Sequence, residues 1–197
     1  MIGLKEISLS ATQAMARENA TSVNTELNQA MDTVRSLAHI FSGFEKLNPE
    51  ERRGSMNKHM QTILEKNPNF LGVWTCWEPN ALDGLDGKFT NQEGTDATGR
   101  LIPYWNRGAG KIVLMTSVAV PIFDRKEAFV GVAGIDIELA KFQKMIDGIH
   151  PYETVISALF SNHGIIVAHQ GSVERRKASP WGNPFAGGTG DQGVLNI

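Results

Sequence analysis

Aromatic rings and carboxylates gather in one short stretch of the sequence, residues 70–105. It holds three of the four tryptophans, one of the two tyrosines, and Asp83, Asp86 and Asp96. A hydrophobic core needs the rings but not the acids, and a solvated loop needs the acids but not the rings. The face of an aromatic ring attracts a cation, and a nearby carboxylate adds to that attraction. The combination therefore favours a pocket for a small ammonium group.

Spacing along the strands decides which of these side chains can meet. Trp74 and Trp77 are three residues apart on a predicted strand, so they lie on opposite faces, one in the core and one available to a ligand. Tyr104 and Trp105 are adjacent, and the same division applies to them. Asp136 ends a strongly apolar strand just before a predicted helix. It either caps that helix or aims its carboxylate into a cavity between sheet and loop.

Other chemistries fit the sequence less well. Asp83 and Asp86 lack the spacing and the closing glutamate of a calcium loop, which favours a solvated turn. The histidines stand singly at unrelated spacings, so no metal site is expected. Glu78 with either aspartate could imitate a glycosidase acid pair, but no nucleophile motif or phosphate-binding glycine loop accompanies them. The sequence therefore predicts neither an enzyme nor a cofactor.

Bulk properties exclude further classes. The chain of 197 residues is 41% hydrophobic and 20% charged, which is ordinary for a globular protein. A net charge of −2 offers no basic surface for nucleic acid. The single Cys76 cannot form an internal disulfide and leaves the redox compartment open. No apolar run is long enough to span a bilayer, and no signal peptide is evident. These features fit a cytosolic protein or an excised soluble part of a larger one.

A long amphipathic helix is predicted from about Ser10 to Phe44. Its apolar residues recur every three or four positions on one stripe: Val23, Leu27, Met31, Val34, Ala38 and Phe41. A helix of roughly 35 residues is about 50 Å long. Such a helix either packs along one side of a domain or pairs with a second copy, so a homodimer through this helix is one expectation.

The remaining elements follow in the order expected of an α+β protein. Asn48-Pro49 starts a second helix and Asn67-Pro68 ends it. Extended segments are predicted at 70–78 and 100–105, and a hairpin at 111–123 and 128–137. A third helix is predicted at 137–149 and a second hairpin at 154–160 and 165–169. The last 27 residues show little periodicity and read as loop or as an unfinished domain.

Four segments together resemble the double Cache sensor domains of bacterial methyl-accepting chemotaxis receptors. They are "GVWTCWEPNALDGLDGKF", "GTDATGRLIPYWNRG", "VLMTSVAVPI" and "FVGVAGIDIEL". The resemblance covers about Ala11 to His169. It implies a long N-terminal helix beside two PAS-like antiparallel-sheet modules on the periplasmic, extracytoplasmic side of a membrane-anchored receptor. Residues 1–47 would form the helix, 48–150 the membrane-distal ligand-binding module and 151–197 an incomplete membrane-proximal module.

The resemblance also implies roles for site residues. In amino-acid-binding members, an arginine two residues before a Trp-Tyr pair holds the ligand carboxylate, and an aspartate ending the "G-x-D" strand takes the ammonium. Here the pair is Tyr104-Trp105, the aspartate is Asp136, and Ile102 occupies the arginine position. The carboxylate clamp is thus missing, which favours an amine, polyamine or quaternary ammonium ligand.

Further residues and alternatives accompany that expectation. Trp74 and Trp77 would add rings, and Asp83 or Asp86 a second charge contact. Arg100 or Arg107 could instead hold an acid, so a purine, an amino acid or an organic acid remains an alternative ligand. A dimerisation or docking module without a ligand is the alternative of another class.

One departure from the family pattern affects the pocket. Between Gly110 and Lys111 the family normally has a few dozen more residues, which close the pocket from below. Here they are deleted, or the sequence joins across a gap. With an intact pocket, its closure around the ligand would shift the long helix and so signal across the membrane.

Overall fold

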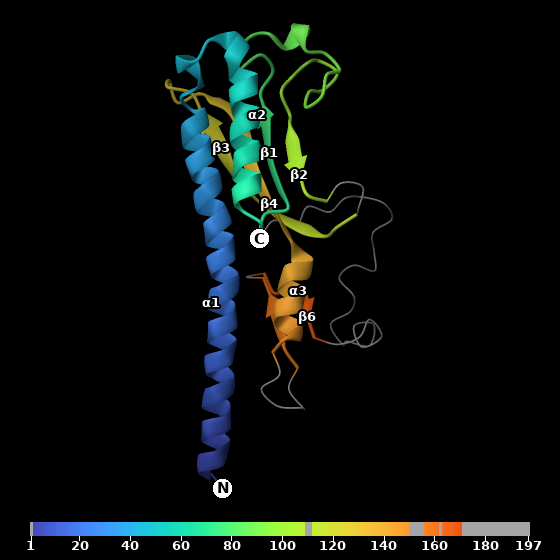
Figure 1. Cartoon of the computed structure of the whole chain (residues 1–197). Coiled ribbons are helices and arrows are strands. Elements are labelled where there is room, and N and C mark those ends of the chain that lie inside the picture. Colours follow the sequence, from blue (N-terminus) through green and yellow to red (C-terminus); the bar gives the residue numbers. More distant parts are fainter. Residues whose placement is uncertain (1, 109–111, 150–155, 162, 171–197) are drawn as a thin grey trace. The chain divides into compact units, whose positions relative to one another are not determined.

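The computed structural model describes residues 2–108, 112–149, 156–161 and 163–170 (Figure 1). The expectations for the join at Gly110 and Lys111 and for the last 27 residues lie outside these. The elements are α1 (Ile2–Phe41), η1 (Phe44–Lys46), α2 (Pro49–Lys66), β1 (Gly72–Trp77), η2 (Asp86–Lys88), β2 (Tyr104–Asn106), β3 (Met115–Phe123), β4 (Phe129–Glu138), α3 (Leu139–Asp147), β5 (Ala158–Phe160) and β6 (Ile166–His169). None of the helices among the described residues has the length and hydropathy that crossing a bilayer requires.

Helix α1 is longer than the sequence predicts at its start and shorter at its end. It begins at Ile2 and ends at Phe41, and Phe44 lies in the short 3₁₀ turn η1 instead. The predicted apolar stripe packs within the chain, since its members Val34, Ala38 and Phe41 are buried. The stripe is therefore a packing surface of the monomer. Helix α2 begins and ends where the two Asn-Pro pairs predict.

Packing divides the chain into two compact units. The first, here called the sheet unit, contains residues 27–113 and 117–137, and the second, the hairpin unit, contains the described parts of 1–26, 114–116 and 138–197. The expected boundaries at 47 and 150 do not coincide with this division. Residues 27–41 of α1 belong to the sheet unit, where Phe41 packs against Trp77 of the sheet, and α3 packs on β6.

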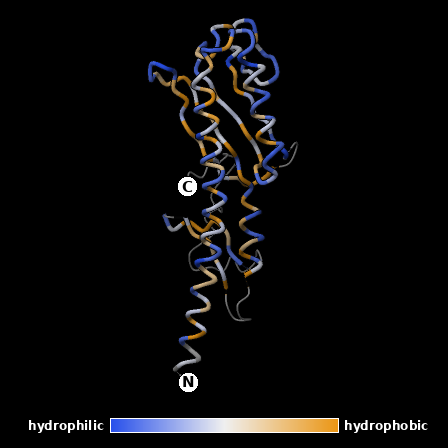
Figure 2. The backbone as a smooth tube through the Cα atoms, turned by 60° about the vertical axis from the view of Figure 1, so that its left-hand side comes forward, coloured by the Kyte–Doolittle hydropathy of each residue, from blue (hydrophilic) through white to orange (hydrophobic). Residues whose placement is uncertain are grey.

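The sheet unit is built on a four-stranded sheet in the order β2-β1-β4-β3. Strand β1 pairs antiparallel with both β2 and β4, and its register sets Val73 opposite Trp105 and Ile135. The predicted hairpin at 111–137 is present as β3 and β4, with its turn at Asp124 to Glu127. Hydrophobic stretches run along the strands in Figure 2.

One face of this sheet carries the core. Along β1, Val73, Thr75 and Trp77 alternate onto that face and are almost fully buried. The indole of Trp77 packs against the rings of Phe41 at 6.2 Å and Phe44 at 5.4 Å, which come from the end of α1 and from η1. Helix α2 packs against β1 and β2. The opposite face of the sheet is left for other contacts.

The hairpin unit has its own small set of contacts. Strands β5 and β6 pair antiparallel, as the sequence predicts for the second hairpin. Gln143 of α3 donates to the carbonyl oxygen of His169 at 3.0 Å. Lys141 of α3 pairs with Glu26 of α1, with 2.6 Å between Nζ and Oε2.

Candidate ligand-binding site

The pairing of β1 with β4 places two of the expected residues on the outer sheet face, which is the face opposite the core. Gly72 pairs with Asp136 and Trp74 pairs with Gly134. Because side chains alternate along each strand, Trp74 and Asp136 share one face and Trp77 lies on the other. The predicted separation of the two tryptophans is confirmed. Trp77 is only 1% exposed, so the structure does not bring it together with Asp136.

The carboxylate of Asp136 is the centre of a polar cluster on the outer face. It is 3% exposed and accepts hydrogen bonds from Trp74 Nε1 at 3.0 Å and from Ser117 Oγ at 2.6 Å. A third hydrogen bond joins it to Tyr104. The cap of α3 is Glu138, two residues later, so the capping interpretation of Asp136 is wrong.

The pKa of Tyr104 is shifted by burial and by this carboxylate. Burial, followed by the hydrogen bond with Asp136 and its negative charge, raises the pKa of the Tyr104 hydroxyl well above its usual range. The phenol therefore stays protonated and available as a donor. No Lys or Arg among the described residues forms an ion pair with Asp136, so its partners there are neutral groups.

Two glycines make room for the rings of this cluster. A Cβ added to Gly134 would lie 2.1 Å from the Trp74 ring, and a Cβ added to Gly72 would lie 2.7 Å from the Tyr104 ring. Each ring therefore occupies the space that a side chain at the glycine of the neighbouring strand would fill. This arrangement lets both side chains reach sideways to Asp136.

Ser117 of β3 was not expected from the sequence. Its hydroxyl reaches Asp136 because β3 is the neighbour of β4 in the sheet. A serine beside Thr116 in a mostly apolar predicted strand, "VLMTSVAVPI", was the available signal. Its partner could be identified only once the strand order was known.

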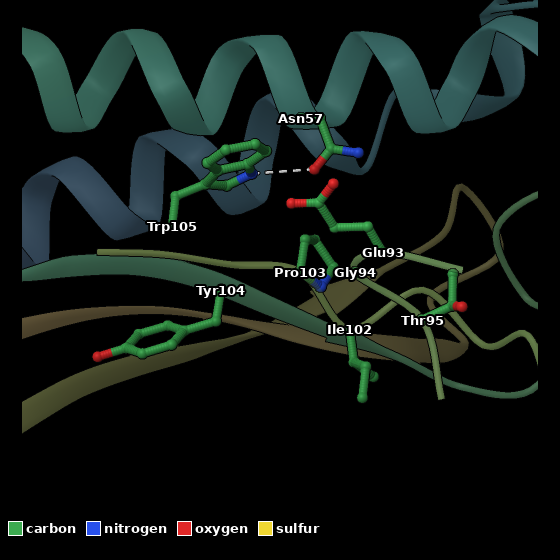
Figure 3. A pocket seen from close by; sticks show the side chains of 8 residues that line it. All are labelled: Asn57, Glu93, Gly94, Thr95, Ile102, Pro103, Tyr104 and Trp105. Carbon is green, nitrogen blue, oxygen red and sulfur yellow. Dashed lines mark hydrogen bonds between the residues drawn. The ribbon is translucent and has the colours of Figure 1, made fainter. Parts of the chain in front are cut away.

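The pair Tyr104-Trp105 is divided between the two faces. Figure 3 shows the two rings pointing to opposite sides of β2. The Trp105 ring lies on the side of α2, where its Nε1 donates to Asn57 Oδ1 at 3.0 Å. Trp105 therefore lies apart from the Asp136 cluster and lines a separate cavity of about 460 Å³.

The two arginines considered as carboxylate clamps have other partners. Arg100 pairs with Asp96 at 3.1 Å, and Arg107 donates to the carbonyl oxygen of Leu64. Ile102, at the family's arginine position, points to the same side of β2 as Tyr104 (Figure 3). It is apolar, so it cannot pair with a ligand carboxylate.

Asp83 and Asp86 form a separate buried cluster around Arg53 of α2, and no local sequence pattern predicts this pairing. Arg53 lies 2.6 Å from Asp83 and 2.5 Å from Asp86, donates to the Gly99 carbonyl oxygen at 2.8 Å, and stacks over the Phe89 ring at 4.2 Å. Both carboxylates are thus ion-paired within the chain, which corrects the expectation that they contact a ligand ammonium.

This cluster lies beyond the far end of β1 from Asp136. The loop that carries it joins the sheet where Trp77 N donates to the Leu101 carbonyl oxygen, whereas Asp136 pairs with Gly72 at the other end of β1. The six residues of the strand correspond to about 17 Å. The structure therefore does not bring Asp83 or Asp86 to the outer-face cluster.

Comparison with known proteins finds similarity to the sensor domains of chemoreceptors. Residues 92–144 match the family model described as methyl-accepting chemotaxis protein-like, first PDC sensor domain. A stretch of 61 residues is 38% identical to the methyl-accepting chemotaxis protein TlpQ of Pseudomonas aeruginosa, and it covers 30% of this chain and 8% of that protein. The chain thus spans a small part of that relative's length.

Solved structures share the fold. The extracellular domain of mmHK1S-Z2, named as a histidine kinase, superposes with a TM-score of 0.73 at 24% identity, over 85% of this chain and 74% of that one. The periplasmic sensory domain of the Campylobacter jejuni chemoreceptor Tlp1 gives 0.54 at 14% identity, over 78% and 69%. They confirm the α+β class, with a long N-terminal helix beside an antiparallel sheet. The family match over residues 92–144, the partial similarity to a chemoreceptor and the shared fold together make this chain similar to sensor domains of the PDC, or Cache, type.

Proposed function

We propose that the sheet unit binds a small amine, polyamine or quaternary ammonium ligand on its outer face and so acts as the sensor of a membrane-anchored chemoreceptor. The ligand's cationic group would lie against Asp136, Trp74 and Tyr104. The observation that carries the proposal is the buried Asp136 carboxylate, surrounded by two rings and a hydroxyl and without an ion pair among the described residues.

The physical argument rests on charge compensation. A buried carboxylate without a cationic partner is costly, and neutral donors compensate only part of that cost. A ligand ammonium would supply the missing positive charge through a charge-assisted hydrogen bond. The faces of Trp74 and Tyr104 would add cation–π attraction. An anionic ligand would be repelled by Asp136, and Arg100 and Arg107 are engaged elsewhere.

Signalling and assembly form part of the proposal. Closure of the site around a ligand would shift α1, whose Phe41 packs against Trp77 on the other face of the same sheet. A homodimer would use the first turns of α1, where Ile7 is 68% exposed and Leu9 58% exposed. Replacing both residues by glutamate should convert a dimer to a monomer in light scattering, and an unchanged mass would contradict this interface.

A thermal-shift screen tests the ligand class. The panel contains choline, betaine, putrescine, spermidine, several amino acids, purines and organic acids, and each hit is titrated by calorimetry. A ligand that binds only the folded chain raises its melting temperature by mass action. Stabilisation by amines and quaternary ammonium compounds alone is the expected result.

The other outcomes point to the alternatives. Stabilisation by purines, amino acids or organic acids would keep the sensor and overturn its ligand class. No stabilisation by any member would favour a module that dimerises or docks a protein partner. Deletion of the segment that the family has after Gly110 would favour that alternative, because a pocket open on one side would hold a small ligand weakly.

A further inference from the structure

A second cavity lies at the edge strand β2, with Trp105 and Asn57 on its α2 side and Ile102 and Tyr104 on the other side (Figure 3). Its volume is about 460 Å³, enough for a small organic molecule. Trp105, Ile102 and Pro103 line it with apolar surface. Its polar lining comes from Asn57, Thr95 and Glu93.

The ring of Trp105 is a fixed wall of this cavity. It is half-buried, and its Nε1 donates to Asn57 Oδ1 at 3.0 Å, which holds the indole beside α2. The pairing of Trp105 with Val73 turns its side chain toward the helix side of the sheet. An indole held in this way offers its face to a ligand with little loss of side-chain freedom.

Glu93 supplies the only charged side chain among the residues that line the cavity. Its carboxylate points toward Asn57 in Figure 3. No Lys, Arg or His among the described residues forms an ion pair with it. The cavity therefore combines one unpaired negative charge with an aromatic face and apolar walls.

This combination selects one class of ligand. A calcium ion takes six to eight oxygen ligands, whereas the cavity offers a single carboxylate. The Thr95 hydroxyl is already hydrogen-bonded to the carbonyl oxygens of Phe89 and Gln92, at 2.7 and 2.8 Å. An anion would be repelled by Glu93. A small organic cation satisfies both the carboxylate and the indole face.

We propose that the cavity between Trp105 and Glu93 is a second binding site for a small organic ammonium ion, separate from the site at Asp136. It extends the proposed function, because different residues would hold its ligand. Tyr104 lines this cavity and also bonds to Asp136, so its strand lies between the two sites.

The two sites carry separate reporters, which allows each to be tested alone. Trp74 Nε1–H is bonded to Asp136 and Trp105 Nε1–H to Asn57, so their indole signals in ¹H–¹⁵N correlation spectra report one site each. Trp77 serves as the core control. The variants Trp74→Phe and Trp105→Phe assign the signals. Choline and putrescine are the cationic probes, and 3,3-dimethyl-1-butanol is the neutral isostere of choline.

The expected result is a saturable shift of the Trp105 indole signal with choline, putrescine or both, and none with the neutral isostere. The shift should persist in Asp136→Asn. Glu93→Gln should weaken it about fivefold, as befits an exposed charge pair. The matched variant Glu65→Gln, an exposed glutamate on α2, should leave it unchanged.

The second site would be overturned by no saturable Trp105 shift with either cation, by an equal shift with the neutral isostere, or by a shift unaffected by Glu93→Gln. A shift of Trp105 that disappears in Asp136→Asn would show indirect sensing of the first site and would also overturn it. If the Trp74 indole signal did not shift while the Trp105 signal did, the result would count against the proposed function and not against the second site.

Discussion

The indole nitrogen of Trp74 lies 3.0 Å from a carboxylate oxygen of Asp136, although the two residues are not direct partners across β1 and β4. Trp74 pairs with Gly134, and its ring lies against that glycine on its way to Asp136. The absence of a side chain at one position thus permits the contact between two others. The contact between Trp74 and Asp136 therefore depends on the glycine in β4 as well as on the two side chains.

Gly134→Ala should therefore displace the Trp74 ring. The new Cβ would lie 2.1 Å from it, so the indole must move and its hydrogen bond to Asp136 must break. We expect a loss of about 1–3 kcal/mol in the free energy of unfolding from overpacking, together with at least about tenfold weaker amine binding. Urea unfolding and calorimetry measure the two effects.

A matched glycine provides the control. Gly54 lies within α2 and has nothing within 4 Å of an added Cβ. Gly54→Ala should raise the free energy of unfolding by about 0.5–1 kcal/mol and leave binding unchanged. If Gly134→Ala behaved like Gly54→Ala, the contact between Trp74 and Gly134 would not be what holds the indole.

The two tryptophans of β1 should respond differently to truncation. Trp77→Ala should cost about 3–5 kcal/mol of stability, because a fully buried ring packed on Phe41 and Phe44 is removed. Trp74→Ala should cost only about 1 kcal/mol of stability and should abolish detectable amine binding instead. Equal losses of stability at both positions, with binding retained by Trp74→Ala, would contradict these roles.

Arg53 should be far more important for stability than a surface arginine. Arg53→Met leaves Asp83 and Asp86 buried without their cation, which should cost about 3–5 kcal/mol. Arg35, whose pair with Asp32 is exposed, is the control, and Arg35→Met should change stability by less than about 0.5 kcal/mol. Chemical unfolding of both variants measures the difference, and similar values would argue against a stabilising role for the Arg53 cluster.

Two carboxylates predict how stability depends on pH. Burial alone would raise the pKa of Asp83, but hydrogen bonds from Arg53 and Leu85 and the arginine charges lower it. The Thr98 hydroxyl, aided by backbone N–H groups and Arg100, lowers the pKa of Asp96 from 3.8 to about 2. Since both values lie below those of the unfolded chain, this stabilisation is present above pH 3.8 and is lost as the pH falls toward about 2.

Asp96→Asn tests the acid dependence directly. The variant should unfold with a smaller change in free energy between pH 3.8 and about 2 than the parent chain, because one titrating group is gone. Urea midpoints at several pH values in that range measure the slope. An unchanged slope would show that Asp96 does not contribute to the loss of stability in acid.

Local patterns predicted much of this architecture. The Asn-Pro pairs marked both ends of α2, and the two-residue period separated Trp74 from Trp77. Contacts across long sequence separations were not accessible in the same way. Arg53 meets Asp83 across 30 residues and Asp86 across 33, and nothing near any of the three signals the pairing.

In the candidate site, too, local patterns predicted some features, and others depended on contacts between distant parts of the chain. The position of Asp136 at the end of an apolar strand allowed either a cap or a pocket carboxylate, and only the strand order distinguished them. Ser117 belongs to the cluster because β3 lies beside β4. Trp105 does not belong to it, because the alternation along β2 turns its ring toward Asn57. The sheet face on which a side chain lies, and the residues that it meets there, depend on pairing partners that are far away in the chain.

The most direct test of the central claim is calorimetric titration of the strongest amine hit into three proteins: the parent chain, Asp136→Asn and Glu138→Gln. The two variants make the same change in charge two residues apart, but only Asp136 is buried among donors, since Glu138 is exposed. The account predicts that Asp136→Asn weakens binding by about ten- to a hundredfold, the range for loss of a charge-assisted hydrogen bond, while Glu138→Gln binds like the parent. Parent-like affinity in a folded Asp136→Asn would contradict it.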